Sequence, residues 1–359
     1  MTIEAGNTPT IRNWTKTAAL GCLGLVAFAG STAAAGHEVP PPSSKFDLSH
    51  WKITLPIDEN GDSKPDEKTV KQLGKYQHDD FFYLDSDGGL VFAAPNKATT
   101  TANSSNTRSE LRQMPRGTNT RIGTHDPGNN FSVKARKGSD KFAAVGGKLQ
   151  ATLKVDHVAL NAGEPEARAA YSVVVGQIHA VKYDSTRSGF GYGNEPIKIY
   201  FKKFPGHEAG MVFWNYERNL GKDDPDRNDL SVPVFGGNWD TKEDPGENGI
   251  KLGEEFSYEI NVHENTMYVT FHNDRLGTVT HGRSLVRGAD AKDNPYAYGG
   301  DSLYFKAGVY NQCSTKSGGG NWYAACAGTG DWETDKANGD YAQATFSRIE
   351  LSSSTPPAQ

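Results

Sequence analysis

Short segments in which apolar and polar residues alternate recur along most of this 359-residue chain, and this pattern limits its fold more than any other feature. Side chains of a β-strand point to opposite faces in turn, so alternation predicts strands with one buried face. Helical periodicity is weak, with one short helix expected at 70–73. Many strands without crossover helices predict an all-β protein, an antiparallel β-sandwich or jelly roll. The predicted strands cover 131–134, 149–155, 170–179, 197–204, 256–262, 267–271, 303–312 and 345–351.

The first 35 residues have the pattern of an export signal. Arg12 and Lys16 precede an apolar run at 17–29, and Ala33-Ala34-Ala35 supplies a cleavage site before Gly36. The run is short and interrupted by glycines, which argues against a membrane anchor. We therefore expect a secreted or periplasmic protein. The rest of the chain divides into a short Pro/Ser linker at 36–45, a single domain at 46–351 and a frayed tail at 352–359.

Removal of the signal changes both the charge and the cysteine count of the chain. The remaining sequence has 36 Lys and Arg against 42 Asp and Glu, a net charge of −6. A mildly acidic protein is a poor candidate for nonspecific nucleic-acid binding, so any attraction for a polyanion needs a local basic site. Cys313 and Cys326 remain. In an exported protein they predict a disulfide, with two free thiols as the alternative.

Three of the strand-like segments combine an apolar face with an unusually polar one. In the segment 108–112, the charged side chains of Arg108, Glu110 and Arg112 share a face opposite Leu111. Gln177 and His179 share a face in the same way. In the segment 304–312, one face carries Tyr304, Lys306, Gly308, Tyr310 and Gln312, whereas the other carries Phe305, Ala307, Val309 and Asn311.

These polar faces contain the groups that one reaction requires. His179 and Tyr310 can transfer protons. Arg108 and Arg112 can hold a carboxylate by bidentate hydrogen bonds, and Gln177 can donate its amide to the same group. Abstraction of a proton α to a carboxylate builds negative charge that such a site must neutralise. Each segment alone is better explained as an ion-pair ladder or a packed aromatic, so the hypothesis depends on their combination.

The chain resembles the alginate lyases of polysaccharide lyase family 7. The family has three signature blocks, which stand here as RSELR at 108–112, QIH at 177–179 and YFKAGVYNQ at 304–312, in the family's order. The segment FDLSHWKITLPI at 46–57 is similar to the family's first strand. The resemblance spans most of 46–351. It implies a concanavalin-like jelly roll with a concave cationic substrate groove, an alginate substrate and no required cofactor.

The resemblance also implies a role for each site residue. Arg108 and Gln177 would bind the uronate carboxylate, and His179 would act as base at C5. Tyr310 would protonate the glycosidic oxygen and serve as base for the other epimer, while Glu110 would orient the arginines. The product would be an oligosaccharide with a 4,5-unsaturated uronate at its new non-reducing end. The residues expected to line neighbouring subsites are Arg112, Lys198, Lys306 and Gln312.

Two further expectations concern substrate preference and mode of action. In the family, isoleucine in the QIH block accompanies activity on guluronate or mixed blocks, so Ile178 points to guluronate-containing substrate. We expect an open groove and endo cleavage by a monomer. The loops that would close the groove ends are 183–195 and 217–250, both rich in Gly, Asp and Asn.

Other interpretations remain open at this point. A non-catalytic carbohydrate-binding sandwich could use Trp214 and Tyr216 as an aromatic platform. A glycoside hydrolase would need two facing carboxylic acids, of which Glu110 is one candidate. A lyase acting on another polyuronate would use the same chemistry. The acidic segment 58–67 has oxygen ligands suited to calcium, but a polar turn explains it more simply.

Overall fold

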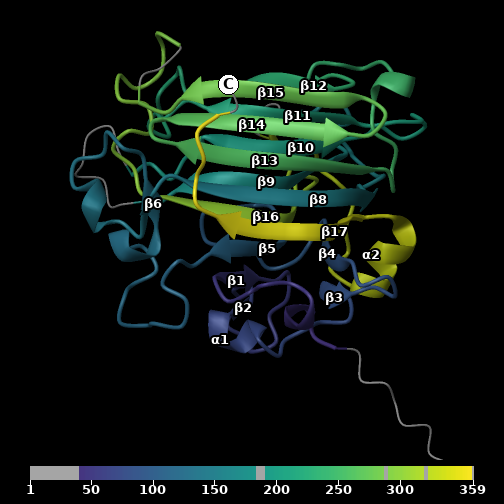
Figure 1. Cartoon of the computed structure of the whole chain (residues 1–359). Helices are drawn as coiled ribbons and strands as arrows, with labels where there is room; N and C mark the ends of the chain where they lie inside the picture. The colour runs from purple at the N-terminus through teal and green to yellow at the C-terminus, as the bar shows by residue number, and fades with distance from the viewer. Residues whose placement is uncertain (1–39, 183–190, 287–289, 319–321, 358–359) are drawn as a thin grey trace, which may run out of the picture. The chain divides into compact units, whose positions relative to one another are not determined.

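The computed structural model describes residues 40–182, 191–286, 290–318 and 322–357 (Figure 1). The predicted export signal at 1–35 lies outside these residues. Within them the chain forms two antiparallel sheets that pack face to face, with β15, β14, β13, β8 and β17 in front of the second sheet in Figure 1. The predicted all-β jelly roll is therefore confirmed. No helix in the described part of the chain is long and apolar enough to cross a membrane.

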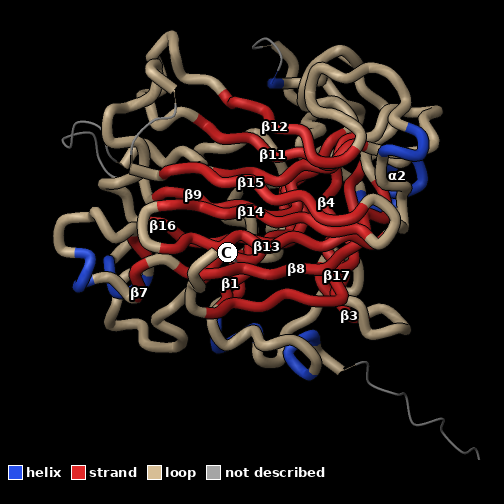
Figure 2. Tube along the Cα trace, turned by 45° about the horizontal axis from the view of Figure 1, so that its top comes forward, coloured by secondary structure: helices blue, strands red, loops and turns tan. Residues whose placement is uncertain are grey.

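The ten-stranded sheet carries the predicted site. Its order is β12 (Asp229–Phe235), β11 (Met211–Glu217), β10 (Ile197–Lys202), β9 (Ser172–Ala180), β16 (Leu303–Asn311), β5 (Arg108–Gln113), β1 (Trp51–Thr54) and β2 (Glu67–Lys68), with β6 (Phe131–Ser132) and β7 (Ala144–Val145) at the side. The seven-stranded sheet has the order β15 (Gly277–Ser284), β14 (Thr266–Asn273), β13 (Glu255–His263), β8 (Gly147–His157), β17 (Tyr341–Ser352), β4 (Leu90–Pro95) and β3 (Phe82–Leu84). Loops connect almost all of these strands (Figure 2).

Alternation along the strands builds the core between the sheets. In β8, buried and partly exposed residues alternate from Gly147 to Val155. Phe305, Ala307 and Val309 of β16 also point into this core and are fully buried. This burial of apolar area is the main force that holds the two sheets together. It also fixes register, because a one-residue slip would turn the buried face of a strand outward.

Every predicted strand is present, but several strands escaped prediction. β4 is buried along its whole length, so it has no alternation to detect. β11 is also buried throughout, because the core covers one face and an aromatic cluster covers the other. The segment 217–250, which we predicted as a loop, contains β12 at 229–235, so that prediction is wrong there. β15 has little buried area and was also missed.

Both short helices have clear capping signals. The predicted helix at 70–73 is confirmed as α1 (Val70–Leu73), which begins with a reciprocal capping box between Thr69 and Gln72. The second helix, α2 (Trp332–Asn338), was not predicted. Asp331 caps its first turn, and a left-handed glycine ends it.

The ends of the domain are tied to the sandwich. Part of the predicted linker forms a 3₁₀ helix, η1 (Pro42–Ser44), in which Pro42 is buried. Ser43 Oγ donates a hydrogen bond to the Gly74 carbonyl at 2.9 Å. In the predicted tail, Thr355 exchanges hydrogen bonds with Asn261 of β13. The predicted Cys313–Cys326 disulfide is present, with a Cα–Cα distance of 5.6 Å.

Candidate active site

The outer face of the ten-stranded sheet brings the predicted site residues together. They come from the central strands β5, β16, β9 and β10, and the antiparallel register aligns them in rows across these strands. One row runs through Lys52, Arg112, Lys306, Gln177, Lys198 and Asn215. A second contains the pair Tyr304 and His179, and a third the pair Tyr310 and Arg108. The three signature segments therefore form one continuous polar surface.

Glu110 is the centre of a buried charge network. Its carboxylate pairs with Arg108 Nη1 at 3.0 Å and with Lys306 Nζ, and it also accepts the Gln177 amide. Burial alone would raise the pKa of Glu110, but the charges of Lys306 and Arg108 outweigh this effect and lower it. Glu110 is therefore an anion. Two cations around one carboxylate leave the network one positive charge in excess, which suits an anionic substrate.

Lys306 is the more adjustable of the two cations. It is almost fully buried, and burial together with the nearby charge of Arg108 lowers its pKa to about 8, although Glu110 opposes this shift. Two residues along its strand, Gly308 pairs with Glu110 of β5. Gly308 has φ 130°, and a Cβ atom there would lie 2.6 Å from the Ser109 carbonyl oxygen. Only glycine fits this contact without strain.

Tyr310 lies beside this network and is partly exposed. Its ring stacks on the Arg108 guanidinium, 3.9 Å from the ring centroid, and its hydroxyl lies 3.0 Å from Ser104 Oγ. One edge of the ring packs against an apolar cluster on the same face of the sheet. That cluster consists of Val174, Tyr200, Met211, Phe213 and Trp239.

A register shift in β9 allows this cluster to form. Simple alternation would place Val174 and Gln177 on opposite faces. Instead, the pairing of β9 with both neighbours shifts between residues 174 and 176, and the consecutive residues Val175 and Gly176 both face the core. Such a bulge redirects side chains within a strand. Val174 therefore packs beside Tyr310, while Gln177 still reaches Glu110.

His179 makes contacts through both nitrogens of its ring. Nδ1 lies 2.7 Å from the Ala180 carbonyl oxygen, and Nε2 lies 3.0 Å from Glu195 Oε1. The ring also stacks on Tyr304 at a centroid distance of 5.3 Å. Arg112 covers Tyr304 in turn, 4.0 Å from the ring centroid. Burial raises the pKa of Tyr304 to about 12, so this phenol stays protonated at neutral pH.

Arg112 is held by a loop rather than by Glu110. Its guanidinium donates to the Gln113 and Thr124 carbonyls and to Asn130 Oδ1. We expected Glu110 to contact both arginines, but it pairs with Arg108 and not with Arg112.

Two other predicted subsite residues also have partners within the protein. Lys198 Nζ lies 3.3 Å from Glu195 and 3.2 Å from Asp229, so carboxylates already compensate its charge. Gln312 donates its amide to the Tyr310 carbonyl at 3.2 Å. Lys306 is thus the expected subsite cation that lies within the Glu110 network.

The aromatic platform considered for a carbohydrate-binding module does not exist in the expected form. Trp214 and Tyr216 point into the core between the sheets, with exposed fractions of 3% and 0%. Their strand neighbours Met211 and Phe213 face outward instead. Alternation along β11, which was not predicted as a strand, decides which of its aromatic residues face the core and which face the outer side of the sheet.

Sequence reasoning missed Glu195 and Ser104, which contact His179 and Tyr310. Both lie outside the signature blocks, in loop segments without periodicity. Only their three-dimensional position brings them to the site. Glu195 directly precedes Pro196 at the start of β10, and its backbone amide donates to Glu217 Oε2 of β11 at 3.0 Å. That contact anchors the backbone from which the Glu195 carboxylate reaches His179.

The acidic segment 58–67 forms a turn with its own hydrogen bonds. The Asp58 carboxylate accepts from the backbone amides of Asp62 and Ser63, and Lys68 pairs with Glu59 and Asp66. Across the residues that the structure describes, no group of three or more His, Cys, Asp and Glu side chains could hold a metal ion.

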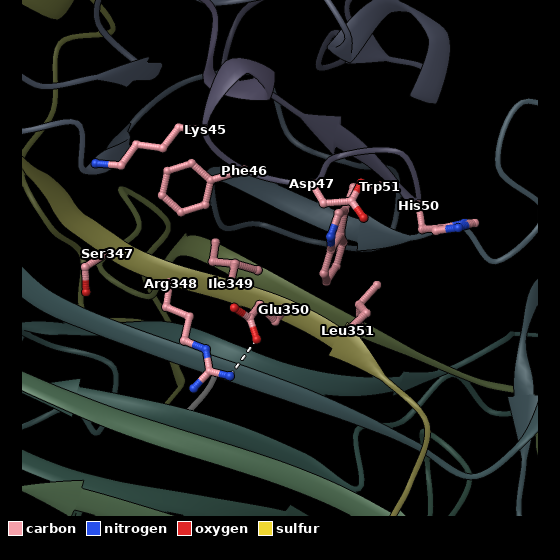
Figure 3. A pocket seen from close by; sticks show the side chains of 10 residues that line it. All are labelled: Lys45, Phe46, Asp47, His50, Trp51, Ser347, Arg348, Ile349, Glu350 and Leu351. Carbon is pink, nitrogen blue, oxygen red and sulfur yellow. Dashed lines mark hydrogen bonds and ion pairs between the residues drawn. The ribbon is translucent and has the colours of Figure 1, made fainter.

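A hollow of about 450 Å³ lies away from this site, where residues 45–51 meet β17 (Figure 3). Its aromatic residues, Phe46 and Trp51, have exposed fractions of only 6% and 1%. Its charged residues have mixed signs, and Arg348 pairs with Glu350 along β17. The hollow therefore offers neither a stacking surface nor a cationic one.

A jelly roll with a cationic network flanked by a histidine and a tyrosine defines an enzyme of the polysaccharide lyase class. The family model described as alginate lyase matches residues 46–353. The chain belongs to this family, the alginate lyases of polysaccharide lyase family 7.

Individual relatives agree with this assignment. An alginate lyase from Klebsiella pneumoniae is 35% identical over 320 residues, which cover 87% of this chain and 91% of the relative. The crystal structure of the alginate lyase from Klebsiella pneumoniae has a TM-score of 0.69 at 32% identity, with 88% of this chain and 99% of that chain covered. An exolytic alginate lyase of the same family from Zobellia galactanivorans has a TM-score of 0.70 at 35% identity, with the same coverage.

Proposed function

We propose that this alginate lyase cleaves its substrate by β-elimination at the Glu110 network. Arg108 and Lys306 bring the excess positive charge, and Gln177 completes the group around the uronate carboxylate. Neutralisation of that carboxylate stabilises the negative charge that develops when the C5 proton leaves. Because the network is buried and already hydrogen-bonded, little reorganisation is needed during the reaction.

The stacking of Tyr310 on Arg108 is the observation that carries this proposal. It places a partly exposed tyrosine directly beside the cation that would bind the carboxylate. Tyr310 then returns a proton to the glycosidic oxygen as the bond to C4 breaks. His179 is the base for the epimer that presents its C5 hydrogen on the histidine side, and Tyr310 is the base for the other.

Absorbance of the new conjugated double bond tests the reaction directly. The chain from Gly36 onward is incubated separately with polyguluronate, polymannuronate and mixed alginate. We expect a rise in ultraviolet absorbance that Tyr310→Phe abolishes. Tyr268→Phe, which removes a hydroxyl from β14 in the other sheet, should leave it unchanged. A flat trace on all three substrates with folded protein, or full activity in Tyr310→Phe, would overturn the proposal.

The same incubation ranks the substrate blocks. We propose a preference for guluronate-containing blocks, on the basis of Ile178. This side chain is fully buried in the core between Gln177 and His179, so it acts through the position of its neighbours. Faster cleavage of polymannuronate than of polyguluronate would contradict this preference.

We further propose an exported, monomeric endolyase that needs no added metal. Endo cleavage predicts a fast fall in viscosity and a ladder of oligosaccharides, whereas an exolytic enzyme releases short products from the start. The Zobellia relative is described as exolytic, so product analysis is the deciding measurement. A mature N-terminus near Gly36, elution as a monomer and an unchanged rate in chelator are the remaining expected results.

A further inference from the structure

Both ring nitrogens of His179 face atoms that accept hydrogen bonds. A carbonyl oxygen cannot donate, so Nδ1 must carry a proton to bond the Ala180 oxygen at 2.7 Å. An ionised carboxylate cannot donate either, so Nε2 must carry a proton to bond Glu195 Oε1 at 3.0 Å. A ring that donates from both nitrogens is an imidazolium, which is the acid form of the proposed base.

Glu195 is an anion in this environment. Burial alone would raise its pKa, but Lys198 and His179 outweigh burial and hold the pKa of Glu195 well below its ordinary value. Its second oxygen lies 3.3 Å from Lys198 Nζ, and its own backbone amide bonds to Glu217. The carboxylate therefore cannot turn away from His179 without breaking its contact with Lys198.

The charges around the pair also support a charged histidine. The carboxylates of Glu195, Glu217 and Asp229 all lie near Lys198. Lys198 and Arg227 supply two positive charges, so a protonated His179 would bring the local net charge to zero. Glu217 is the rival holder of the proton, because burial and the charge of Glu195 raise its pKa well above the ordinary value. However, Arg227 Nε and the Glu195 amide donate to its two oxygens, and these contacts favour the carboxylate form of Glu217 over the acid. The groups that face the pair are Lys198, Glu217, Arg227, Asp229 and Tyr304, with Arg112 over Tyr304.

We propose that Glu195 is a positioning residue that orients His179 and stabilises its imidazolium form. This inference rests on the proposed role of His179 in proton abstraction. His179 must first lose one ring proton to solvent. It can then take the proton from C5, while the electrons of that C–H bond form the C4–C5 double bond. The bond from C4 to oxygen breaks with its electron pair, and Tyr310 protonates the leaving oxygen.

The pH profile of kcat/KM on polyguluronate tests this role. In Glu195→Gln, loss of the adjacent negative charge disfavours the imidazolium, so the acidic limb should move to lower pH by about one unit or more. Glu195→Asp keeps the charge and should keep the limb close to that of the wild type. Glu350→Gln removes a carboxylate from the pair with Arg348 on β17 and should change nothing. An acidic limb that does not move in Glu195→Gln overturns the proposal.

Nitrogen chemical shifts of the histidine rings give a second readout that does not need activity. Near neutral pH, His179 should have two protonated nitrogens in the wild type and one in Glu195→Gln. His281 is an internal reference, because its Nδ1 accepts a hydrogen bond from Trp214 Nε1 at 2.9 Å and is therefore unprotonated.

A neutral His179 ring in the wild type would overturn the proposal and assign the proton to Glu217. Failure of the proposed function is distinguishable from this result. It would appear as no absorbance change on any alginate block in the wild type, whereas the nitrogen shifts would still report on the Glu195 contact.

Discussion

Replacement of Glu110 by glutamine tests whether the network is held by its central charge. The substitution keeps the shape of the side chain but leaves Arg108 and Lys306 buried without a counter-ion. Removal of one partner from a buried ion pair costs about 3–5 kcal/mol, because the other charge stays desolvated. The glutamine oxygen can still accept one hydrogen bond, so we expect a loss near the lower end, about 3 kcal/mol.

Urea unfolding followed by tryptophan fluorescence measures this loss. A double-mutant cycle with Lys306→Met separates the ion pair from its surroundings. If the pair is the cause, the double variant should be at least about 1 kcal/mol more stable than the sum of the single effects predicts. Glu350→Gln, at an exposed pair, is the matched control and should have a far smaller effect. A loss below about 1 kcal/mol in Glu110→Gln, or strictly additive effects, would refute the argument.

Three further predictions concern pH and backbone geometry. Above a pH of about 8, Lys306 loses its proton, so KM for alginate should rise with pH in the wild type and stay flat in Lys306→Arg. Gly308→Ala should lower the free energy of unfolding by about 1–3 kcal/mol, because its Cβ would collide with the Ser109 carbonyl, whereas Gly282→Ala on β15 meets only ordinary contacts. Burial, followed by the charge of Lys242, lowers the pKa of Lys202 from 10.5 to about 7. Between these two pH values the unfolded chain binds one more proton than the folded chain, so the free energy of unfolding rises with pH. Lys202→Met lacks this rise, so its free energy of unfolding in urea, relative to that of the wild type, should fall by about 3 kcal/mol between about pH 6.5 and about pH 9.5. A difference between the two proteins that is the same at both pH values would contradict the lowered pKa of Lys202.

Local alternation was enough to predict most of the polar face that carries the candidate site. Period two assigns Arg108 and Glu110 to one face, and likewise Tyr304, Lys306 and Tyr310, because strand geometry is a property of neighbouring residues. The same rule predicted the core residues of β16 and β8. It failed for strands buried on both faces, such as β4 and β11, since their sequences do not alternate.

Tertiary structure decided which predicted residues have partners and which unpredicted ones join them. Register across the sheet pairs Glu110 with Lys306 but leaves Arg112 to the loop that contains Asn130. The start of β10 brings Glu195 to His179, although no local pattern marks it. The physical reason is that periodicity determines the direction of a side chain, whereas contact, burial and charge depend on segments that are distant in sequence.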